Sequence, residues 1–231
     1  MILAFGSLIL LLNSMIKVGI LDFGFGNLKS LTNAFDFIDQ EYSIITNLSK
    51  EHELGECTHL LLPGVGSFAY GSSQMQKFKL REYLTAEVKN GKPILGICLG
   101  MQPLFESSNE DGFNPGLSFY KGKCECFTND ENFNGTVPHV GYSQMHIHNT
   151  SDSLWRNISK SSPFYFVHSY RVSTKGIGSY HNYAIAEHGK IKFISYVRAE
   201  NIIGVQFHPE KSQMAGLQFL KNFCDLPSIK A

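Results

Sequence analysis

The sequence predicts one α/β domain with a mixed, mostly parallel central sheet flanked by helices, and with antiparallel edge strands in the C-terminal half. Short apolar segments alternate with longer segments of helical periodicity up to residue 97, which is typical of parallel βαβ units. Shorter aromatic segments follow after about residue 115 and alternate in part, which favours antiparallel strands. The 231 residues are 43% hydrophobic and 17% charged, which is enough apolar material for one filled core.

The expected elements of the first half follow from apolar runs and their breakers. "KVGILDF" predicts a buried strand, the helical spacing of "NLKSLTNAFDFI" predicts a helix, and Pro63 and Gly64 stop the apolar run "THLLLPG". A helix is also expected to begin directly after Cys98. In chain order the expected elements are a strand at 17–23, a helix at 27–38, strands at 42–46 and 58–64, a helix at about 74–89, and a central strand at 93–97.

The second half contains six aromatic segments that predict strands at one edge of the sheet. These segments are 117–127, 143–149, 163–172, 183–189, 192–200 and 202–209, and a helix at 214–226 is expected to end the fold. No internal repeat, low-complexity segment or linker interrupts the chain, so we expect a single domain.

The N-terminal segment "MILAFGSLILLLNSMIK" has an apolar stretch of roughly a dozen residues, shorter than the ~20 residues that span a bilayer. No basic residue precedes the stretch, and no clear small-x-small cleavage site follows it. Met15 stands directly before the first expected strand. We therefore expect residues 1–14 to be an N-terminal extension and residues 15–231 to be the domain. A cleaved or membrane-associated leader is the alternative.

The composition argues against several classes of partner. Lys plus Arg equals Asp plus Glu at 20 each, so no basic field is expected for nucleic acid or for a membrane surface. The five cysteines are irregularly spaced and odd in number, which predicts a reducing, cytoplasmic compartment. Cys124 and Cys126 lack the further ligands of a structural zinc site, so no metal is expected.

Two further patterns have ordinary interpretations. Gly24 and Gly26 resemble the start of a dinucleotide fingerprint, but Lys29 occupies the third glycine position, so nucleotide binding is not favoured. Six histidines are expected in polar or strand-edge settings without an acidic partner at useful spacing: His52, His59, His146, His148, His181 and His188.

Cys98 is the candidate nucleophile. It follows a buried strand in "PILGICLGMQ", and Gly96 and Gly100 flank it in the G-x-C-x-G arrangement of a nucleophile elbow. A sharp turn there would present the thiol at the carboxyl edge of the sheet, where open α/β sheets place their ligand sites. The N-terminus of the expected helix would favour the thiolate. The alternative is a buried cysteine that fills the core.

His208 and Glu210 are the candidate base and its orienting acid. His208 ends the strand in "IIGVQFHPE", and Glu210 stands two residues beyond it. A carboxylate at that spacing can accept a hydrogen bond from one imidazole nitrogen and fix the tautomer, so that the other nitrogen faces the thiol. A structural histidine at a strand end is the alternative.

The loop "PGVGSF" is the candidate oxyanion hole. Gly64, Val65 and Gly66 follow a neighbouring strand, and the glycines allow backbone N–H groups to turn inward. The N–H of Leu99, directly after the nucleophile, is the natural second donor. An ordinary glycine turn is the alternative.

Taken together, these segments resemble the class I, triad-type glutamine amidotransferases, and most closely the glutaminase subunits of imidazole glycerol phosphate synthases. The resemblance is carried, in family order from about residue 17, by "VGILDFGFGNLKS", "LLLPGVGSF", "GKPILGICLGMQPLFESS", "VPHVGYSQ", "FYFVHSYR" and "GVQFHPEKS". It implies a flavodoxin-like α/β fold and argues against an α/β-hydrolase, in which the acid precedes the histidine.

The resemblance implies a role for each matching residue. Cys98 would attack the side-chain amide of L-glutamine, and His208, oriented by Glu210, would protonate the departing ammonia. Gln102, Ser169 and Tyr170 would hold the glutamine head group. The Gly64-Val65-Gly66 loop would become an oxyanion donor after a peptide rearrangement that the partner triggers. The family uses no metal or organic cofactor.

The resemblance also implies a partner, a (β/α)8-barrel cyclase with which the chain would form a heterodimer. That cyclase uses the ammonia to make imidazole glycerol phosphate, in histidine biosynthesis, and the purine intermediate AICAR. Tyr142, Ser143 and Lys211 would lie at the interface. Tyr142 and Ser143 replace the Trp and Asn usual there, so a paralogue that supplies ammonia to an enzyme modifying bacterial surface sugars is the alternative. A free-standing cysteine hydrolase is a second alternative function.

Overall fold

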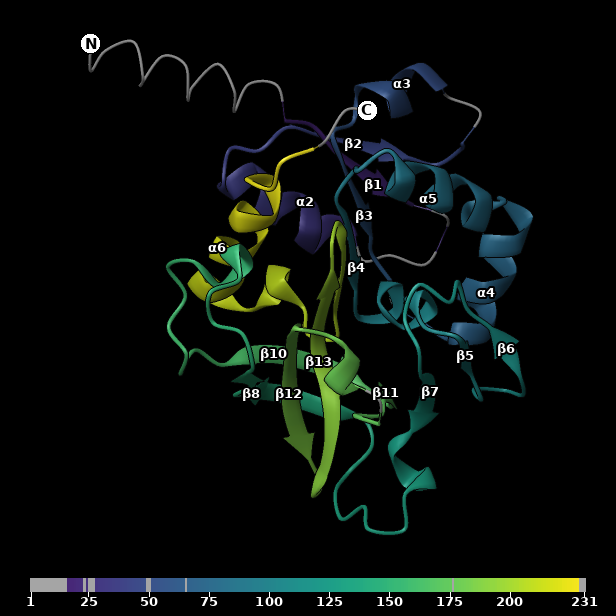
Figure 1. Cartoon of the computed structure of the whole chain (residues 1–231), viewed down its shortest axis with the longest axis vertical. Coiled ribbons are helices and arrows are strands. Elements are labelled where there is room, and N and C mark those ends of the chain that lie inside the picture. Colours follow the sequence, from purple (N-terminus) through teal and green to yellow (C-terminus); the bar gives the residue numbers. More distant parts are fainter. Residues whose placement is uncertain are drawn as a thin grey trace.

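The computed structural model describes residues 16–22, 24, 28–48, 51–64, 66–175 and 177–228. Its centre is an eight-stranded sheet, seen near edge-on in Figure 1. The strand order is β2 (Tyr42–Ile45), β1 (Val18–Leu21), β3 (His59–Leu62), β4 (Ile94–Ile97), β14 (Ile202–Val205), β13 (Ile191–Ala199), β12 (Asn182–His188) and β9 (His146–Ile147). The pairs from β2 to β14 are parallel, and those from β14 to β9 are antiparallel. The expected mixed sheet is therefore confirmed.

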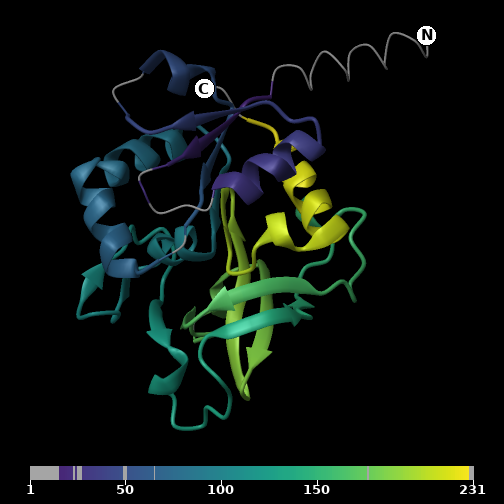
Figure 2. The ribbon, with the colours of Figure 1, turned by 180° about the vertical axis from the view of Figure 1, so that it is seen from behind.

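Helices cover both faces of the parallel part of this sheet. Helices α2 (Leu28–Phe37) and α6 (Gln213–Cys224) pack on one face through a core that includes Leu61 and Leu95. Helices α4 (Phe68–Lys77) and α5 (Leu80–Lys89) pack on the other through Leu60, Leu62 and Ile94. Successive residues of one strand thus serve opposite cores, which explains the unbroken apolar runs. Figure 2 shows α2 beside α6, with α4 and α5 across the sheet.

The aromatic second half differs from the expectation of a single edge. Besides β13, β12 and β9, it builds two small sheets that lie apart from the central one. One pairs β10 (Phe164–His168) with β8 (His139–Ser143), and the other has the order β11 (Tyr170–Val172), β7 (Lys123–Cys126), β5 (Ser107–Ser108), β6 (Asn114–Pro115). The expected strands at 117–127 and 143–149 shorten to β7 and β9; Ser143 belongs to β8 instead, and most of the remaining residues are in irregular or bent backbone.

The expected helix at 74–89 is two helices. Lys79 adopts a left-handed φ of 52°, which ends α4 and lets α5 begin at Leu80 in a new direction. The hydroxyl of Ser67 accepts a hydrogen bond from the Tyr70 N–H and caps α4, so that helix begins earlier than expected. The short helix α3 (Glu51–Glu56) was not expected.

The expected helix directly after Cys98 is also wrong. The chain forms two single 3₁₀ turns there, Cys98–Gly100 and Gln102–Leu104, and then leaves the helical region at Phe105. Pro103 lacks the N–H that an α-helix would need at that position. The side chain of Cys98 therefore gains no support from a helix dipole.

His59 is not in a polar setting. It lies in β3 with 1% of its surface exposed, and its Nε2 is 3.0 Å from the Leu226 carbonyl oxygen. Burial lowers the His59 pKa to about 4, so the imidazole is a neutral core group at neutral pH.

Three expectations concern the chain's ends and environment. The expected extension at residues 1–14 lies outside the described residues. Across the parts of the chain that the structure describes, no helix is long and apolar enough to cross a membrane. No disulfide joins any of the five cysteines, all of which are described.

Candidate active site

Cys98 lies at the carboxyl end of β4, in the middle of the sheet. Its φ of +53° is a left-handed conformation that costs energy for a residue with a side chain. The backbone packs closely against both glycines of this turn. A Cβ on Gly96 would lie 2.4 Å from the Gly100 oxygen, and a Cβ on Gly100 would lie 2.0 Å from the Leu62 oxygen. Both glycines are thus required by space, and the strained turn holds the thiol above the sheet edge.

Gln206 contacts the thiol and was not expected from the sequence. Its Nε2 lies 3.6 Å from the Cys98 Sγ, and the Sγ is also 3.7 Å from the Val167 carbonyl oxygen. The register of β14 against β4 explains the first contact, because Val205 faces Ile97 and the next residues of both strands therefore meet. Gln206 therefore helps to fix the position of the sulfur atom at the end of β4.

His208 and Glu210 form a buried pair, with the His208 Nδ1 2.8 Å from the Glu210 Oε1. The other imidazole nitrogen, Nε2, is buried and has no hydrogen-bond partner of normal geometry. Burial lowers the His208 pKa, but the nearby Cys98 and then Glu210 outweigh it, so the pKa is raised well above 6.5. Glu210 therefore orients the ring through Nδ1 and leaves Nε2 available for proton exchange.

A cavity of about 270 Å³ opens beside Cys98. The structure brings six of the predicted site residues to its wall, together with four that were not predicted, whereas the predicted Gly64, His208 and Glu210 do not line it. The predicted ones are Gly66, Cys98, Leu99, Gln102, Ser169 and Tyr170, and the additional ones are Glu110, Pro138, Val167 and His168. The additional residues come from loops and a small sheet whose placement no local motif reveals.

One candidate oxyanion donor, the Leu99 N–H, is not free in this structure. The Leu99 N–H donates to the Gly64 carbonyl oxygen at 3.3 Å, so it is already engaged. A Cβ on Gly64 would lie 2.6 Å from the Gly100 nitrogen, which shows how closely this loop packs on the nucleophile turn. Val65 lies outside the described residues. A rotation of the Gly64 carbonyl would release the Leu99 N–H toward the cavity.

Polar side chains position one wall of the cavity. The Gln102 Nε2 donates to the Tyr170 carbonyl oxygen at 3.2 Å and to the Gln206 Oε1 at 3.3 Å. Glu110 accepts from the Phe68 N–H at the start of α4, and burial raises its pKa. The cavity therefore combines a thiol, amide groups and one carboxylate, which suits a small zwitterionic ligand.

The three predicted interface residues lie near one another. Tyr142 is 47% exposed on β8, and its hydroxyl donates to the Lys211 carbonyl oxygen at 2.8 Å. The Lys211 Nζ lies 5.8 Å from the ring centre of Tyr165 on β10. Ser143 is half-buried, and its Oγ is 3.0 Å from the His139 Nε2. Val140 and Tyr142 thus present apolar surface directly beside the turn that carries Glu210.

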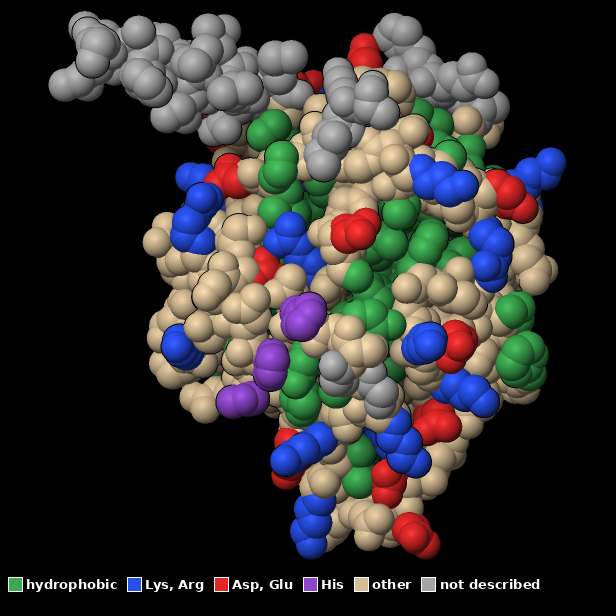
Figure 3. Space-filling model, viewed as in Figure 1, with side chains coloured by type: hydrophobic (Ala, Val, Ile, Leu, Met, Phe, Trp, Pro, Cys, Tyr) green, Lys and Arg blue, Asp and Glu red, His purple; other side chains and the backbone are tan. Residues whose placement is uncertain are grey.

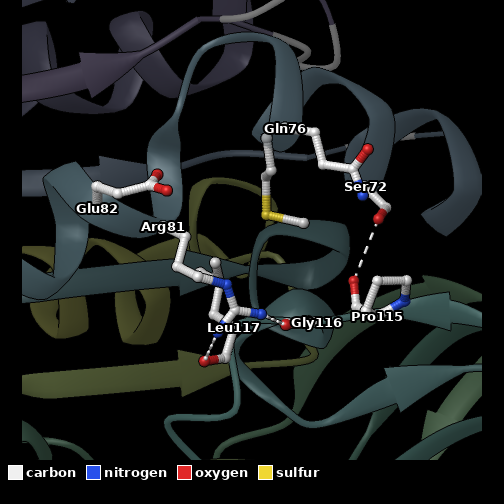
Figure 4. Close-up of a pocket in the computed structure, with 8 residues that line it drawn as sticks. Ser72, Gln76, Arg81, Glu82, Pro115, Gly116 and Leu117 are labelled. Carbon is white, nitrogen blue, oxygen red and sulfur yellow. Dashed lines mark hydrogen bonds between the residues drawn. The ribbon is translucent and has the colours of Figure 1, made fainter.

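A second cavity of about 270 Å³ lies between α4, α5 and the segment 115–117 (Figure 4). Arg81 donates to the Leu117 carbonyl oxygen at 2.9 Å and to that of Gly116, while the Ser72 hydroxyl donates to that of Pro115. These contacts fasten the loop to the helices. None of the predicted site residues lines this cavity.

In the face shown in Figure 3, acidic and basic side chains are interspersed rather than gathered by sign. Within the described ranges, no group of three or more His, Cys, Asp or Glu side chains is placed to hold a metal ion.

A family model described as "Glutamine amidotransferase class-I" matches residues 19–226. Among curated proteins, "Imidazole glycerol phosphate synthase subunit HisH 2" of Vibrio vulnificus is 38% identical over 93% of this chain and 96% of its own length. The HisH subunit of Gloeobacter violaceus is 36% identical over 90% of this chain and 89% of its own. "Imidazole glycerol phosphate synthase hisHF" of Schizosaccharomyces pombe is 35% identical over 89% of this chain but only 37% of its own.

Solved structures are similar in fold. PurLQS from Thermotoga maritima matches with a TM-score of 0.65 and 15% identity, over 90% of this chain and 97% of that one. A structure titled as a glutamine amidotransferase matches with a TM-score of 0.62 and 17% identity, over 89% of this chain and 98% of that one.

Proposed function

The chain belongs to the class I glutamine amidotransferase family, and from that membership we propose that it is the glutaminase subunit of an imidazole glycerol phosphate synthase. It hydrolyses L-glutamine to glutamate and ammonia. The observation that carries the proposal is the buried His208–Glu210 pair beyond the end of β14, beside Cys98 at the end of the adjacent strand β4.

The chemistry proceeds in two steps at Cys98. The Cys98 thiol gives its proton to the His208 Nε2 and its Sγ attacks the side-chain amide carbon of glutamine. The tetrahedral intermediate collapses by breaking the C–N bond, while His208 delivers that proton to the departing ammonia. His208 then removes a proton from water, which attacks the γ-glutamyl thioester and releases glutamate and the thiol. Glu210 holds the imidazole through Nδ1 in both steps and does not react.

The cavity residues recognise the amino-acid end of glutamine. Gln102, Ser169 and Tyr170 contact the head group, and the Glu110 carboxylate pairs with the α-ammonium group. Support comes from the placement of all four in one wall beside Cys98 and from the small volume, which suits an amino acid.

The free subunit is expected to be slow because its oxyanion hole is closed. The tetrahedral intermediate carries an oxyanion that needs N–H donors, and the Leu99 N–H is occupied by the Gly64 carbonyl. Docking of the partner would turn the Gly64–Val65 peptide and free this donor. Glutamine would then be hydrolysed mainly in the complex, so that ammonia is not released without an acceptor.

The partner is a (β/α)8-barrel cyclase that uses the ammonia to form imidazole glycerol phosphate and AICAR in histidine biosynthesis. Ammonia is mostly protonated near neutral pH and is then no nucleophile, which favours direct transfer within a complex. The S. pombe relative supports the pairing, because its printed name joins H and F and the chain spans only 37% of it. The exposed Val140 and Tyr142, with Lys211 and Ser143, form the docking face.

The comparisons do not favour the surface-sugar alternative, since the relatives reported above carry the imidazole glycerol phosphate synthase name. The unusual Tyr142 and Ser143 form hydrogen bonds within the chain, to the Lys211 carbonyl and to His139. These contacts explain the two residues without a different ammonia acceptor.

Replacement of the nucleophile tests the function. Cys98→Ala should lower glutamine hydrolysis by the complex by about three orders of magnitude or more, because no other group can form the thioester. The cyclase reaction should continue at the wild-type rate when ammonium salts replace glutamine. Glutamate release and imidazole glycerol phosphate formation are measured in parallel. Loss of the ammonium-dependent reaction in the variant would contradict the proposed division of labour between the subunits.

A further inference from the structure

Two buried histidines, His168 in the cavity wall and His139 next to it, have no part in the proposed chemistry. His139 begins β8 and His168 ends β10, where the two residues face each other across the antiparallel pair. The His139 Nδ1 lies 3.1 Å from the His168 Nε2. The outer nitrogen of His139 is 3.0 Å from the Ser143 Oγ, and the inner nitrogen of His168, Nδ1, is 2.8 Å from the Tyr170 carbonyl oxygen. The four groups form an unbroken chain of hydrogen bonds.

The direction of this chain is fixed at its inner end. A carbonyl oxygen can only accept, so the His168 Nδ1 must carry a proton and donate it to Tyr170. A neutral His168 then has a lone pair on Nε2, which accepts from the His139 Nδ1–H. His139 in turn accepts at Nε2 from the Ser143 hydroxyl. All donors therefore point inward, from the docking strand β8 toward the cavity.

The surroundings keep both imidazoles neutral. The His168 ring is packed among aromatic rings, including Phe127 and Phe193 at 5.3 and 5.0 Å between ring centres. The His188 ring stacks on His139 at 4.2 Å, so a positive charge there would also be opposed by its neighbour. Burial, and then the neighbouring histidines, lower the pKa of His139 to about 4 and that of His168 to about 3.

The chain continues into the site. The Tyr170 carbonyl that accepts from His168 also accepts from the Gln102 Nε2. Gln102 donates in addition to Gln206, whose Nε2 is directed at the Cys98 sulfur. The carbonyl of Tyr170 is therefore the point where the histidine pair meets the side chains that line the glutamine cavity.

We propose that His139 and His168 are positioning residues that hold the Tyr170 carbonyl, and through it the Gln102 amide, in the arrangement that binds glutamine. Because the Tyr170 carbonyl oxygen can only accept, the Gln102 amide must direct its nitrogen toward it, and the histidines hold that carbonyl in place. Ser143 connects this arrangement to β8, so the docking strand and the cavity wall share one hydrogen-bonded framework. The inference rests on the proposed glutaminase function and adds residues that the reaction itself does not use.

The first test is the tautomer of each histidine. Long-range ¹H–¹⁵N spectra of the uniformly labelled chain at pH 7 distinguish Nδ1–H from Nε2–H imidazoles. We expect His139 and His168 both to be Nδ1–H tautomers. An Nε2–H tautomer at either residue would reverse the order of donors and overturn the inference. This result does not depend on catalysis or on the folding of a variant.

The second test separates the inner and outer hydrogen bonds of His139. In His139→Asn the amide nitrogen takes the place of Nδ1 and can still donate to His168. In His139→Gln the amide takes the place of Nε2, so it reaches Ser143 but not His168. Both variants lose the imidazole ring and its packing, which makes them a matched pair.

Steady-state glutamine hydrolysis by the complex provides the readout. We expect the KM for glutamine to rise about five- to tenfold in His139→Gln, the effect of losing one buried hydrogen bond, with kcat nearly unchanged. His139→Asn should stay close to the wild-type KM. Equal KM values in the two variants, or a larger KM in His139→Asn, would overturn the inference. A wild-type complex that does not hydrolyse glutamine would instead contradict the proposed function.

Discussion

At Cys98 the backbone adopts a conformation that few residues with side chains take, and the cost is met by two glycines that allow close backbone packing. This conformation places the thiol above the sheet edge, in contact with Gln206 and close to His208. At this scale the site is a set of donors and acceptors held by backbone geometry. The strain belongs to the nucleophile and to no other predicted site residue among those described.

The pKa of His208 should respond more to loss of the thiol than to loss of the carboxylate. Cys98 makes the largest contribution that raises this pKa, and Glu210 a smaller one, both against the lowering effect of burial. We expect the pKa to fall in Cys98→Ala and to fall less in Glu210→Gln. Titration of the His208 ring signals by NMR in the two variants and the wild type measures this. An unchanged pKa in Cys98→Ala would show that the thiol and the imidazole do not interact.

The sequence predicted the residues whose roles are indicated by short motifs. Cys98 between its glycines and His208 beside Glu210 are recognisable because the needed partners lie within a few positions. Gln206 and His168 could not be predicted in the same way. The contact of Gln206 with Cys98 depends on the register of β14 against β4, and the partner of His168 depends on the pairing of β10 with β8. Both registers are set by tertiary packing.

Among the elements, strand β8 has one buried face and one exposed face, and the two make different contacts. His139 points into the protein and joins the framework behind the cavity, whereas Val140 and Tyr142 are exposed. The Tyr142 hydroxyl also contacts the turn that carries Glu210 and Lys211. A short strand of this kind can bind a partner and contact the catalytic residues at once.

A charge on the outer face of β8 should weaken docking. Val140 is 56% exposed, and Val140→Asp would bury an unpaired carboxylate in the proposed interface. We expect the Kd for the cyclase to rise about tenfold or more, measured by titration calorimetry, while the fold of the free subunit is unchanged.

The matched control is Phe37→Asp, at the last residue of α2, which is 68% exposed. Because α2 runs back from the carboxyl end of β1, Phe37 lies at the edge of the sheet remote from the site. Its substitution should leave the Kd unchanged. Equal effects of the two substitutions would contradict the assignment of the docking face to β8.

Element boundaries show where sequence periodicity is insufficient. The apolar spacing in 74–89 fits one helix, but the left-handed Lys79 divides the region so that α4 and α5 can both cover the sheet. Similarly, the two 3₁₀ turns after Cys98 replace the expected helix because the chain must clear Leu62 and accommodate Pro103. Packing against neighbouring strands, rather than local propensity, therefore determines these helix boundaries.

At the scale of the whole molecule, the parallel half of the sheet supports the chemistry and the added small sheets support recognition. The nucleophile and base follow the adjacent strands β4 and β14, while Tyr170 begins β11 of a small sheet and Ser169 links it to β10. The parallel half was predictable because continuous apolar runs indicate strands covered on both faces. The small sheets were not, because short aromatic strands do not show which neighbours they pair with.

The measurement that tests the account most directly is glutamate release from glutamine by the subunit alone and with the barrel cyclase and its substrate. Because the Leu99 N–H is engaged by the Gly64 carbonyl, formation of the oxyanion hole in the complex should raise the rate by about two to three orders of magnitude. One imidazole glycerol phosphate should form for each glutamate released. An equal rate with and without the cyclase would contradict the account.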